Sequence, residues 1–177
     1  MPELAVTAIG RDRPGIVASV TGALLELGGN VEDSQMSILG GHFAVMLLVA
    51  VPAGTKREQV VERLSEVAQE HELEAISVAE VSAGAARPAP PSHVLSVYGA
   101  DRPGIVHAVS SALAEAGVNI TDLETKLTGS SEAPIYVMVL EVALGTARSE
   151  TVEAALRKAG GERDLEVSLR ALDTDPL

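Results

Sequence analysis

The chain has 177 residues, which suits one large domain or two small ones, and its apolar fraction of 46% is ample for buried cores. Aromatic residues are only 2% of the chain, so those cores must be aliphatic, and the absence of cysteine excludes disulfides and thiolate metal sites. The net charge of −12, with no run of basic residues, argues against direct binding to nucleic acid, whose phosphates require a basic surface.

In chain order, the first half predicts strand, helix, strand, strand, helix and strand. Alternating apolar residues predict the strands, and apolar residues at helical spacing predict the helices. A tight Gly40-Gly41 turn joins the middle strands. The ranges are strand 3–9, a helix from Pro14 to a glycine cap at Gly28, strands 31–39 and 42–51, helix 56–69 and strand 73–81.

Residues 83–92 are rich in alanine and proline and contain three prolines. Such a segment supports neither a helix nor a central strand, and we interpret it as a short, partly stiff linker. The sequence therefore predicts a first domain at 1–82 and a second at 93–177.

The second half repeats the first. The hexapeptide Asp12-Arg13-Pro14-Gly15-Ile16-Val17 recurs, without a gap, as Asp101-Arg102-Pro103-Gly104-Ile105-Val106, and the match continues through Asn30 and Asn119. The second copy has a longer hairpin turn, at 129–134, and a second helix at 149–159 that we expect to end at Gly160-Gly161. The order βαββαβ predicts two α+β domains of the ferredoxin-like type, each a four-stranded antiparallel sheet with two helices on one face.

The turn after the first strand of each copy is the strongest candidate site. It precedes a helix, whose first backbone N–H groups favour an anion such as a carboxylate. Gly15 and Gly104 carry no β-carbon, so a ligand can approach the backbone, and Asp12 and Asp101 can accept hydrogen bonds from an ammonium group. The alternative is that the aspartates cap the helix.

Asn30 and Asn119 form a second candidate element, just before the second strand of each copy. A side-chain amide donates and accepts hydrogen bonds, so it can hold an amino-acid head group without adding charge. The alternative is that asparagine here only tolerates a left-handed turn.

No other residues suggest chemistry. The four histidines do not repeat between the copies and lack metal-ligand spacing, and Ser110-Ser111 and Ser130-Ser131 have no paired histidine to act as a base. We therefore predict no enzyme activity, no metal and no cofactor. No apolar stretch reaches the roughly 18 residues that span a bilayer, and residues 1–3 lack a basic signal-peptide start, so we expect a cytoplasmic protein without membrane contact.

The DRPGIV turn, the apolar helix after it and the strands opened by GGNVED and GVNITD resemble the ACT domain. The resemblance covers nearly the whole chain twice, and two such domains alone resemble the family of glycine cleavage system transcriptional repressors. It implies binding of a small amino-acid effector, glycine or serine among them, where two domains meet, and a signal passed to a protein partner. It also implies a homo-oligomer.

Carried over residue by residue, the resemblance assigns the effector to ten positions. They are Asp12, Pro14, Gly15, Ile16 and Asn30 in the first copy, and Asp101, Pro103, Gly104, Ile105 and Asn119 in the second. Two other functions remain open: a separate regulatory subunit of an amino-acid or one-carbon metabolic enzyme, and a scaffold that binds no ligand. Because the sequence stops at Leu177, directly after the second copy, an enzyme would need a separate subunit.

Overall fold

The computed structural model describes residues 2–81, 89–130, 133–161 and 163–172. The chain divides into two compact units, Met1–Ala86 and Arg87–Leu177, and each is described by itself. Residues 83–88 of the predicted linker lie outside the described residues, so its limits, and the domain bounds at 82 and 93, stay predictions.

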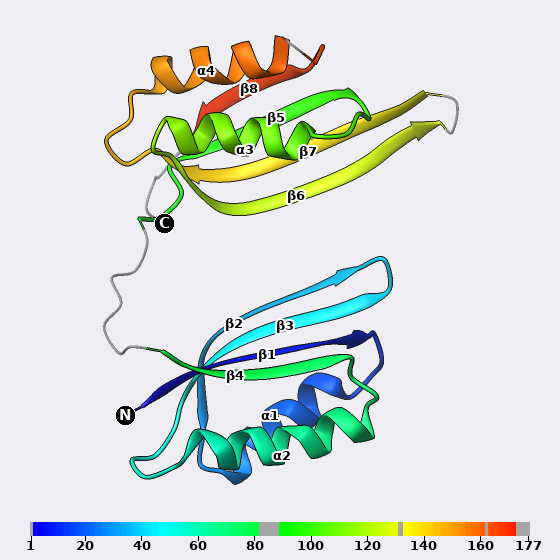
Figure 1. Cartoon of the computed structure of the whole chain (residues 1–177), viewed down its shortest axis with the longest axis vertical. Coiled ribbons are helices and arrows are strands. Elements are labelled where there is room, and N and C mark those ends of the chain that lie inside the picture. Colours follow the sequence, from blue (N-terminus) through cyan, green and yellow to red (C-terminus); the bar gives the residue numbers. More distant parts are fainter. Residues whose placement is uncertain (1, 82–88, 131–132, 162, 173–177) are drawn as a thin grey trace. The chain divides into compact units, whose positions relative to one another are not determined.

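The first domain is a four-stranded sheet with two helices on one face (Figure 1). The strands follow the order β2-β3-β1-β4, and every neighbouring pair is antiparallel. Its elements are β1 (Glu3–Arg11), α1 (Ile16–Glu26), β2 (Asn30–Leu39), β3 (His42–Ala50), α2 (Arg57–Glu70) and β4 (Ala75–Val81).

The second domain has the same architecture, with the strand order β6-β7-β5-β8. Its elements are β5 (His93–Ala100), α3 (Ile105–Glu115), β6 (Asn119–Ser130), β7 (Ala133–Ala143), α4 (Ser149–Gly161) and β8 (Glu166–Ala171). The predicted βαββαβ order is confirmed in both halves. Strands β6 and β7 extend into the predicted turn at 129–134, of which residues 131–132 lie outside the described part. None of the helices in the described ranges is long and apolar enough to cross a membrane.

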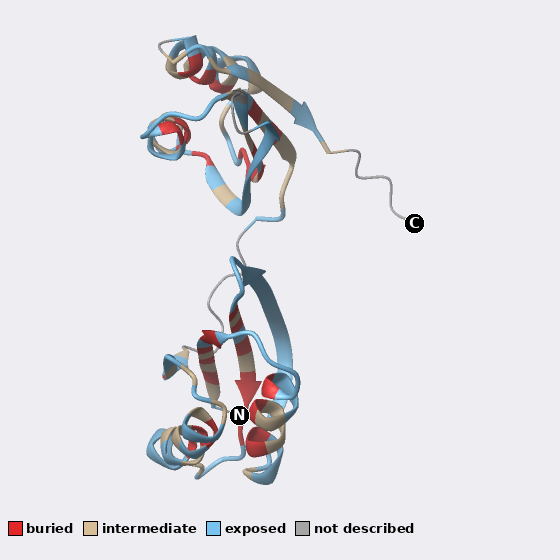
Figure 2. Ribbon diagram, turned by 90° about the vertical axis from the view of Figure 1, so that its right-hand side faces the viewer, coloured by how far each residue is buried: buried red, intermediate tan, exposed pale blue. Residues whose placement is uncertain are grey.

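Each core lies between the sheet and its two helices, where the buried residues gather (Figure 2). In β1 the alternation predicts the faces correctly: Leu4, Val6 and Ala8 are buried, and Ala5 and Thr7 face the other side. Because strand side chains alternate between faces, one apolar series suffices to place a strand against the helices. The cores are almost entirely aliphatic, as the composition predicts, with one aromatic ring, Phe43, buried in the first domain.

The first helix of each domain begins later than predicted. The sequence predicts a start at Pro14, but α1 starts at Ile16, and α3 likewise starts at Ile105. The reason is Gly15, which precedes α1 with a φ of 98°, and Gly104, which precedes α3 with a φ of 87°. A residue in this left-handed region cannot be part of a right-handed helix, and glycine adopts it without steric cost.

The end of α4 also differs from the prediction. Gly160-Gly161 was expected to terminate the helix after Ala159, but α4 continues through Gly161. A β-carbon at Gly160 would lie 2.8 Å from Cγ2 of Val167 and 3.3 Å from the carbonyl oxygen of Leu165. Glycine is therefore present because the chain leading into β8 passes close to the helix.

We expect Gly160→Ala to destabilise the protein by about 1–2 kcal/mol, because the added methyl group overpacks a filled contact. Gly22→Ala in α1 is the matched control. Its β-carbon would meet nothing within 4 Å, so alanine there is expected to stabilise by about 0.5–1 kcal/mol. Urea unfolding of both variants measures the change in the free energy of unfolding. A change in the same direction in both variants would contradict this account of Gly160.

The strands β2 and β6 form one edge of each sheet and are the least buried. Every residue of β2 is exposed, and so is every residue of β6 except Ile120. The exposed residues of β2 include Met36 at 48%, Ile38 at 52% and Leu39 at 77%. An edge strand with exposed apolar side chains favours association with another strand.

Candidate functional site

The two predicted turns lie at the same end of each sheet. In the first domain, the turn from Asp12 to Gly15 follows β1 and lies beside the β2–β3 hairpin, because the backbone N–H of Asp12 donates to the carbonyl oxygen of Gly41 at 3.1 Å. In the second domain, residues 101–104 follow β5 in the same position. All these residues are exposed, whereas the next residue of each chain segment, Ile16 or Ile105, is anchored in the core at 1% or 2% exposure.

The helix that follows each turn begins without a side-chain cap. Gly15 and Gly104 occupy the cap positions, and their carbonyl oxygens accept the first helical hydrogen bonds, from Ser19 and Ala108 at 2.9 and 3.0 Å. The first backbone N–H groups of α1 and α3 receive no side-chain cap, so the capping alternative for the aspartates does not describe this geometry. These N–H groups remain available to an anion.

An ion pair connects each turn to the segment that enters the last strand of its domain. Nη2 of Arg13 lies 2.5 Å from Oε2 of Glu72, and Nη2 of Arg102 lies 3.3 Å from Oδ2 of Asp164. Glu72 and Asp164 have φ values of 51° and 54° and, within the described ranges, are the only non-glycine residues with a positive φ. Both copies thus hold an acidic residue in a strained conformation opposite the arginine of the repeated motif.

A second contact brings the same two segments together. A β-carbon at Gly10 would lie 2.9 Å from Cδ2 of Leu73, and one at Gly99 would lie 2.5 Å from Cδ2 of Leu165. The glycine that opens each turn is therefore required for close packing. β4 begins at Ala75 and not at the predicted residue 73, and Glu72, just before it, has a φ of 51° that is not a strand conformation.

Asn30 and Asn119 lie at the opposite end of the sheet from the turn of their own domain. Asn30 pairs with Ala50, near the start of β1, while the turn lies beside the hairpin after Leu39. At about 3.3 Å per residue, the length of β2 separates the two by roughly 30 Å. Neither asparagine has a positive φ, so the left-handed-turn alternative is wrong; Gly28 and Gly117 adopt that conformation instead.

In the second domain the predicted residues Asp101, Gly104 and Ile105 line an open hollow of about 540 Å³. Sequence reasoning did not single out its other lining residues, which are Arg102, Val106, His107 and Tyr136. Tyr136 pairs with Gly99, and Phe43 pairs with Gly10 in the same register of the first domain. The scarcity of aromatic residues was a usable signal, because the chain has only two tyrosines and one phenylalanine.

The exposed face of the second sheet carries a neighbouring hollow, of about 680 Å³, on the other side of Asp101. Tyr98, Asp164 and Glu166 are among its lining residues. Asp101 therefore borders both hollows. Tyr98, the other tyrosine of the chain, lines the second of them. The turn projects between two open spaces, which leaves its carboxylate accessible.

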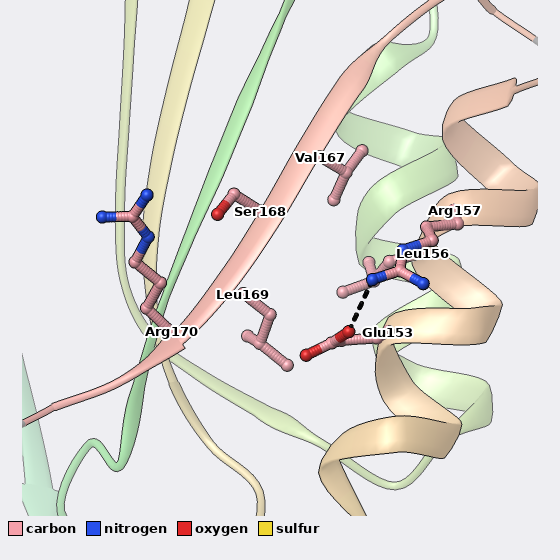
Figure 3. A pocket seen from close by; sticks show the side chains of 7 residues that line it. All are labelled: Glu153, Leu156, Arg157, Val167, Ser168, Leu169 and Arg170. Carbon is pink, nitrogen blue, oxygen red and sulfur yellow. Dashed lines mark hydrogen bonds and ion pairs between the residues drawn. The ribbon is translucent and has the colours of Figure 1, made fainter.

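A third hollow, of about 220 Å³, lies between α4 and β8 and involves none of the predicted residues (Figure 3). Val167 and Leu169 point toward α4, whereas Ser168 and Arg170 point to the opposite face of the strand. Glu153 and Arg157 form an ion pair at 2.8 Å along its helical wall. This arrangement is the alternating packing of an edge strand against a helix.

Comparison with known sequences identifies the domains. Residues 3–77 and residues 93–161 each match the ACT domain. The glycine cleavage system transcriptional repressor of Escherichia coli (strain K12) is 24% identical over 174 residues, which cover 96% of this chain and 90% of that protein. A UPF0237 protein of Methanopyrus kandleri is 40% identical over 65 residues, 34% of this chain and 72% of that protein.

Solved structures agree on the architecture. The crystal structure of a protein from Galdieria sulphuraria has a TM-score of 0.81 and 29% identity, covering 97% of this chain and 98% of that chain. A structure that carries the name of a glycine cleavage system transcriptional repressor has a TM-score of 0.69 at 19% identity, covering 97% of both chains, and this likeness concerns the fold alone. The chain belongs to the ACT domain family, of which it carries two copies in tandem.

Proposed function

We propose that this chain is an amino-acid-responsive regulatory protein and not an enzyme. The observation that carries the proposal is the uncapped helix start beneath each turn, beside an aspartate that makes no capping bond. The N–H groups at Gly15-Ile16 or Gly104-Ile105 suit a carboxylate, and Asp12 or Asp101 suits an ammonium group. Together they match the common head group of an α-amino acid, and glycine and serine are the first candidates.

The prolines of the repeated motif support this site by restricting the backbone. Pro14 and Pro103 have a fixed φ and no N–H, so they stiffen the turn without competing for the ligand's carboxylate. The ion pairs of Arg13 and Arg102 tie the turn to a second segment. A turn that is already ordered loses less conformational entropy when it binds a ligand.

We assign Asn30 and Asn119 to the same function, acting on a turn that is not in their own domain. Both side chains are exposed, and the roughly 30 Å along β2 excludes contact within one domain. Asparagine is also depleted in strands, so its presence at the start of both β2 and β6 favours a functional role. The carrier of the asparagine is another domain, from the same chain or from a second copy.

The exposed edge strands supply a physical reason for domains to associate. As an edge strand, β2 offers its outer backbone N–H and C=O groups to the edge of another strand. We therefore propose a homo-oligomer, which sedimentation equilibrium would detect as a mass above that of one 18.3 kDa chain. A single-chain mass at micromolar concentration would contradict it.

The proposed output is contact with another protein. With a net charge of −12, the chain repels a nucleic-acid duplex, so a role in transcription requires a DNA-binding partner. The relative from Escherichia coli is named a transcriptional repressor of glycine cleavage, which supports control of amino-acid metabolism. Copurification of a metabolic transferase or dehydrogenase would instead favour a regulatory subunit of an enzyme.

Calorimetric titration of the full chain with each proteinogenic amino acid tests the proposal. Saturable heat with glycine, serine or another small amino acid is the expected result. The absence of binding heat with every amino acid would contradict amino-acid sensing and favour a scaffold that binds no ligand.

The double variant Asn30→Ala/Asn119→Ala is expected to weaken effector binding about tenfold to a hundredfold, because it removes one or two hydrogen bonds worth roughly 1–3 kcal/mol. Unfolding in urea is expected to change by no more than about 0.5 kcal/mol per site, since both side chains are exposed. If stability falls and affinity does not, the asparagines serve the fold and their assignment to the site is wrong.

A further inference from the structure

We infer that, of the two repeated turns, only the turn of the second domain binds the effector, and that the turn of the first domain does not. The inference rests on the proposed function and decides which of the two repeated turns performs it. The uncapped helix start does not discriminate, because both domains share it. The discriminating features are the side chains around each turn.

In the second domain, two of the hydrogen-bonding side chains that line the hollow beside Gly104 are not repeated in the first domain. They are Tyr136, which is partly buried, and His107, which is exposed on the first turn of α3. The first domain places Phe43 opposite Gly10, where the second places Tyr136 opposite Gly99, and it places Ala18 where α3 has His107. At the positions that match the phenol and the imidazole, the first domain thus has apolar side chains.

The first domain also fills the space between its helices. His71, at the end of α2, has its Nε2 2.7 Å from Oγ of Ser19, and its Cε1 would lie 3.8 Å from a β-carbon at Gly15. Farther along, Arg63 donates from α2 to Glu26 at 2.8 Å and to Glu66 at 3.0 Å. The hydrogen bond and charge of Arg63 lower the pKa of Glu26.

The second domain leaves the corresponding space open. A groove of about 490 Å³ runs between α3 and α4, and His107 borders both this groove and the hollow beside Gly104. The residues that line this groove include Ala108 and Ala155. The first domain has Ser19 at the position of Ala108 and Arg63 at the position of Ala155. Because these two side chains are small, the groove continues the hollow away from the turn. This space has room for an amino acid whose polar side chain lies near Tyr136 and His107.

The test combines binding stoichiometry with two matched variants, using as probe the amino acid that gives saturable heat in calorimetry. We expect one site per chain. Tyr136→Phe, which installs the ring type that the first domain has at this position, is expected to weaken binding about tenfold, and so is His107→Ala. Ser19→Ala, which removes the bond to His71, is expected to leave affinity unchanged.

Nuclear magnetic resonance locates the ligand independently of affinity. The ring resonances of His107 and His71 are assigned with His107→Gln and His71→Gln in the absence of ligand. On titration of the unsubstituted chain, the His107 signal is expected to shift and the His71 signal to stay in place. Two sites per chain, a shift at His71, or full affinity in both Tyr136→Phe and His107→Ala would overturn the assignment while preserving amino-acid sensing. No binding by any amino acid would overturn sensing itself, and this assignment with it.

Discussion

Gly104→Asn is expected to weaken effector binding by at least about a hundredfold, a free-energy loss of roughly 2.7 kcal/mol. The added side chain would stand beside the first N–H groups of α3, where we place the ligand's carboxylate. Its β-carbon would meet no protein atom within 4 Å, so the protein itself has room for it. Asparagine tolerates the left-handed backbone that a φ of 87° requires better than other residues do, so the fold is expected to survive.

Gly15→Asn is the matched control, because Gly15 has the same cap position and a φ of 98° in the first domain. It imposes a similar backbone cost next to the turn that we infer to be empty, so affinity is expected to stay unchanged. Calorimetry and urea unfolding of both variants separate binding from stability. Equal losses of affinity in the two variants would show that the effector binds at both turns. An unchanged affinity in Gly104→Asn would show that the effector does not bind at this turn.

The fold was predictable because its information is local. Alternating apolar residues in β1 and helically spaced ones in α1 specify both the element and its buried face, and the same pattern recurs in the second copy. The predicted first helix starts too early because Pro14 is compatible with a first helical turn, whereas the φ of Gly15 is set by the geometry of the whole loop.

Features that depend on segments distant in sequence were not predictable. Gly160 resembles a helix terminator, and only its proximity to Val167 explains why glycine is needed inside α4. Similarly, Arg102 looks like a residue of the binding turn, yet the structure pairs it with Asp164, more than sixty positions later. A single sequence contains no pattern that reports such contacts.

The candidate site was predicted only in part for the same reason. The motif itself identified Asp101, Gly104 and Ile105, which do line one hollow. Tyr136 joins them through the register between β5 and β7, which the sequence does not specify. The sequence groups Asn119 with the turn, but Asn119 begins β6 at the end of the sheet away from the turn, so any joint role requires two domains.

The largest loss of stability is expected from Gly99→Val, at about 3 kcal/mol. A β-carbon at Gly99 would lie 2.5 Å from Cδ2 of Leu165 and 3.3 Å from the carbonyl oxygen of Asp164, and a branched side chain adds two more methyl groups to this overpacked contact. Ala100→Val is the control, because it adds two methyl groups at the neighbouring, exposed end of β5 and is expected to change stability by no more than about 0.5 kcal/mol.

The double variant Gly99→Val/Leu165→Ala identifies the cause of this loss. Removing the leucine side chain relieves the closest collision but leaves the backbone of Asp164 in place, so part of the loss is expected to be recovered, with a coupling energy of about 1 kcal/mol or more in urea unfolding. Additive effects would show that the collision with Leu165 is not the source of the instability. Asp164 also forms the ion pair with Arg102, so displacing Asp164 in Gly99→Val is expected to loosen the turn at 101–104 and to weaken effector binding. Ala100→Val is expected to retain effector binding.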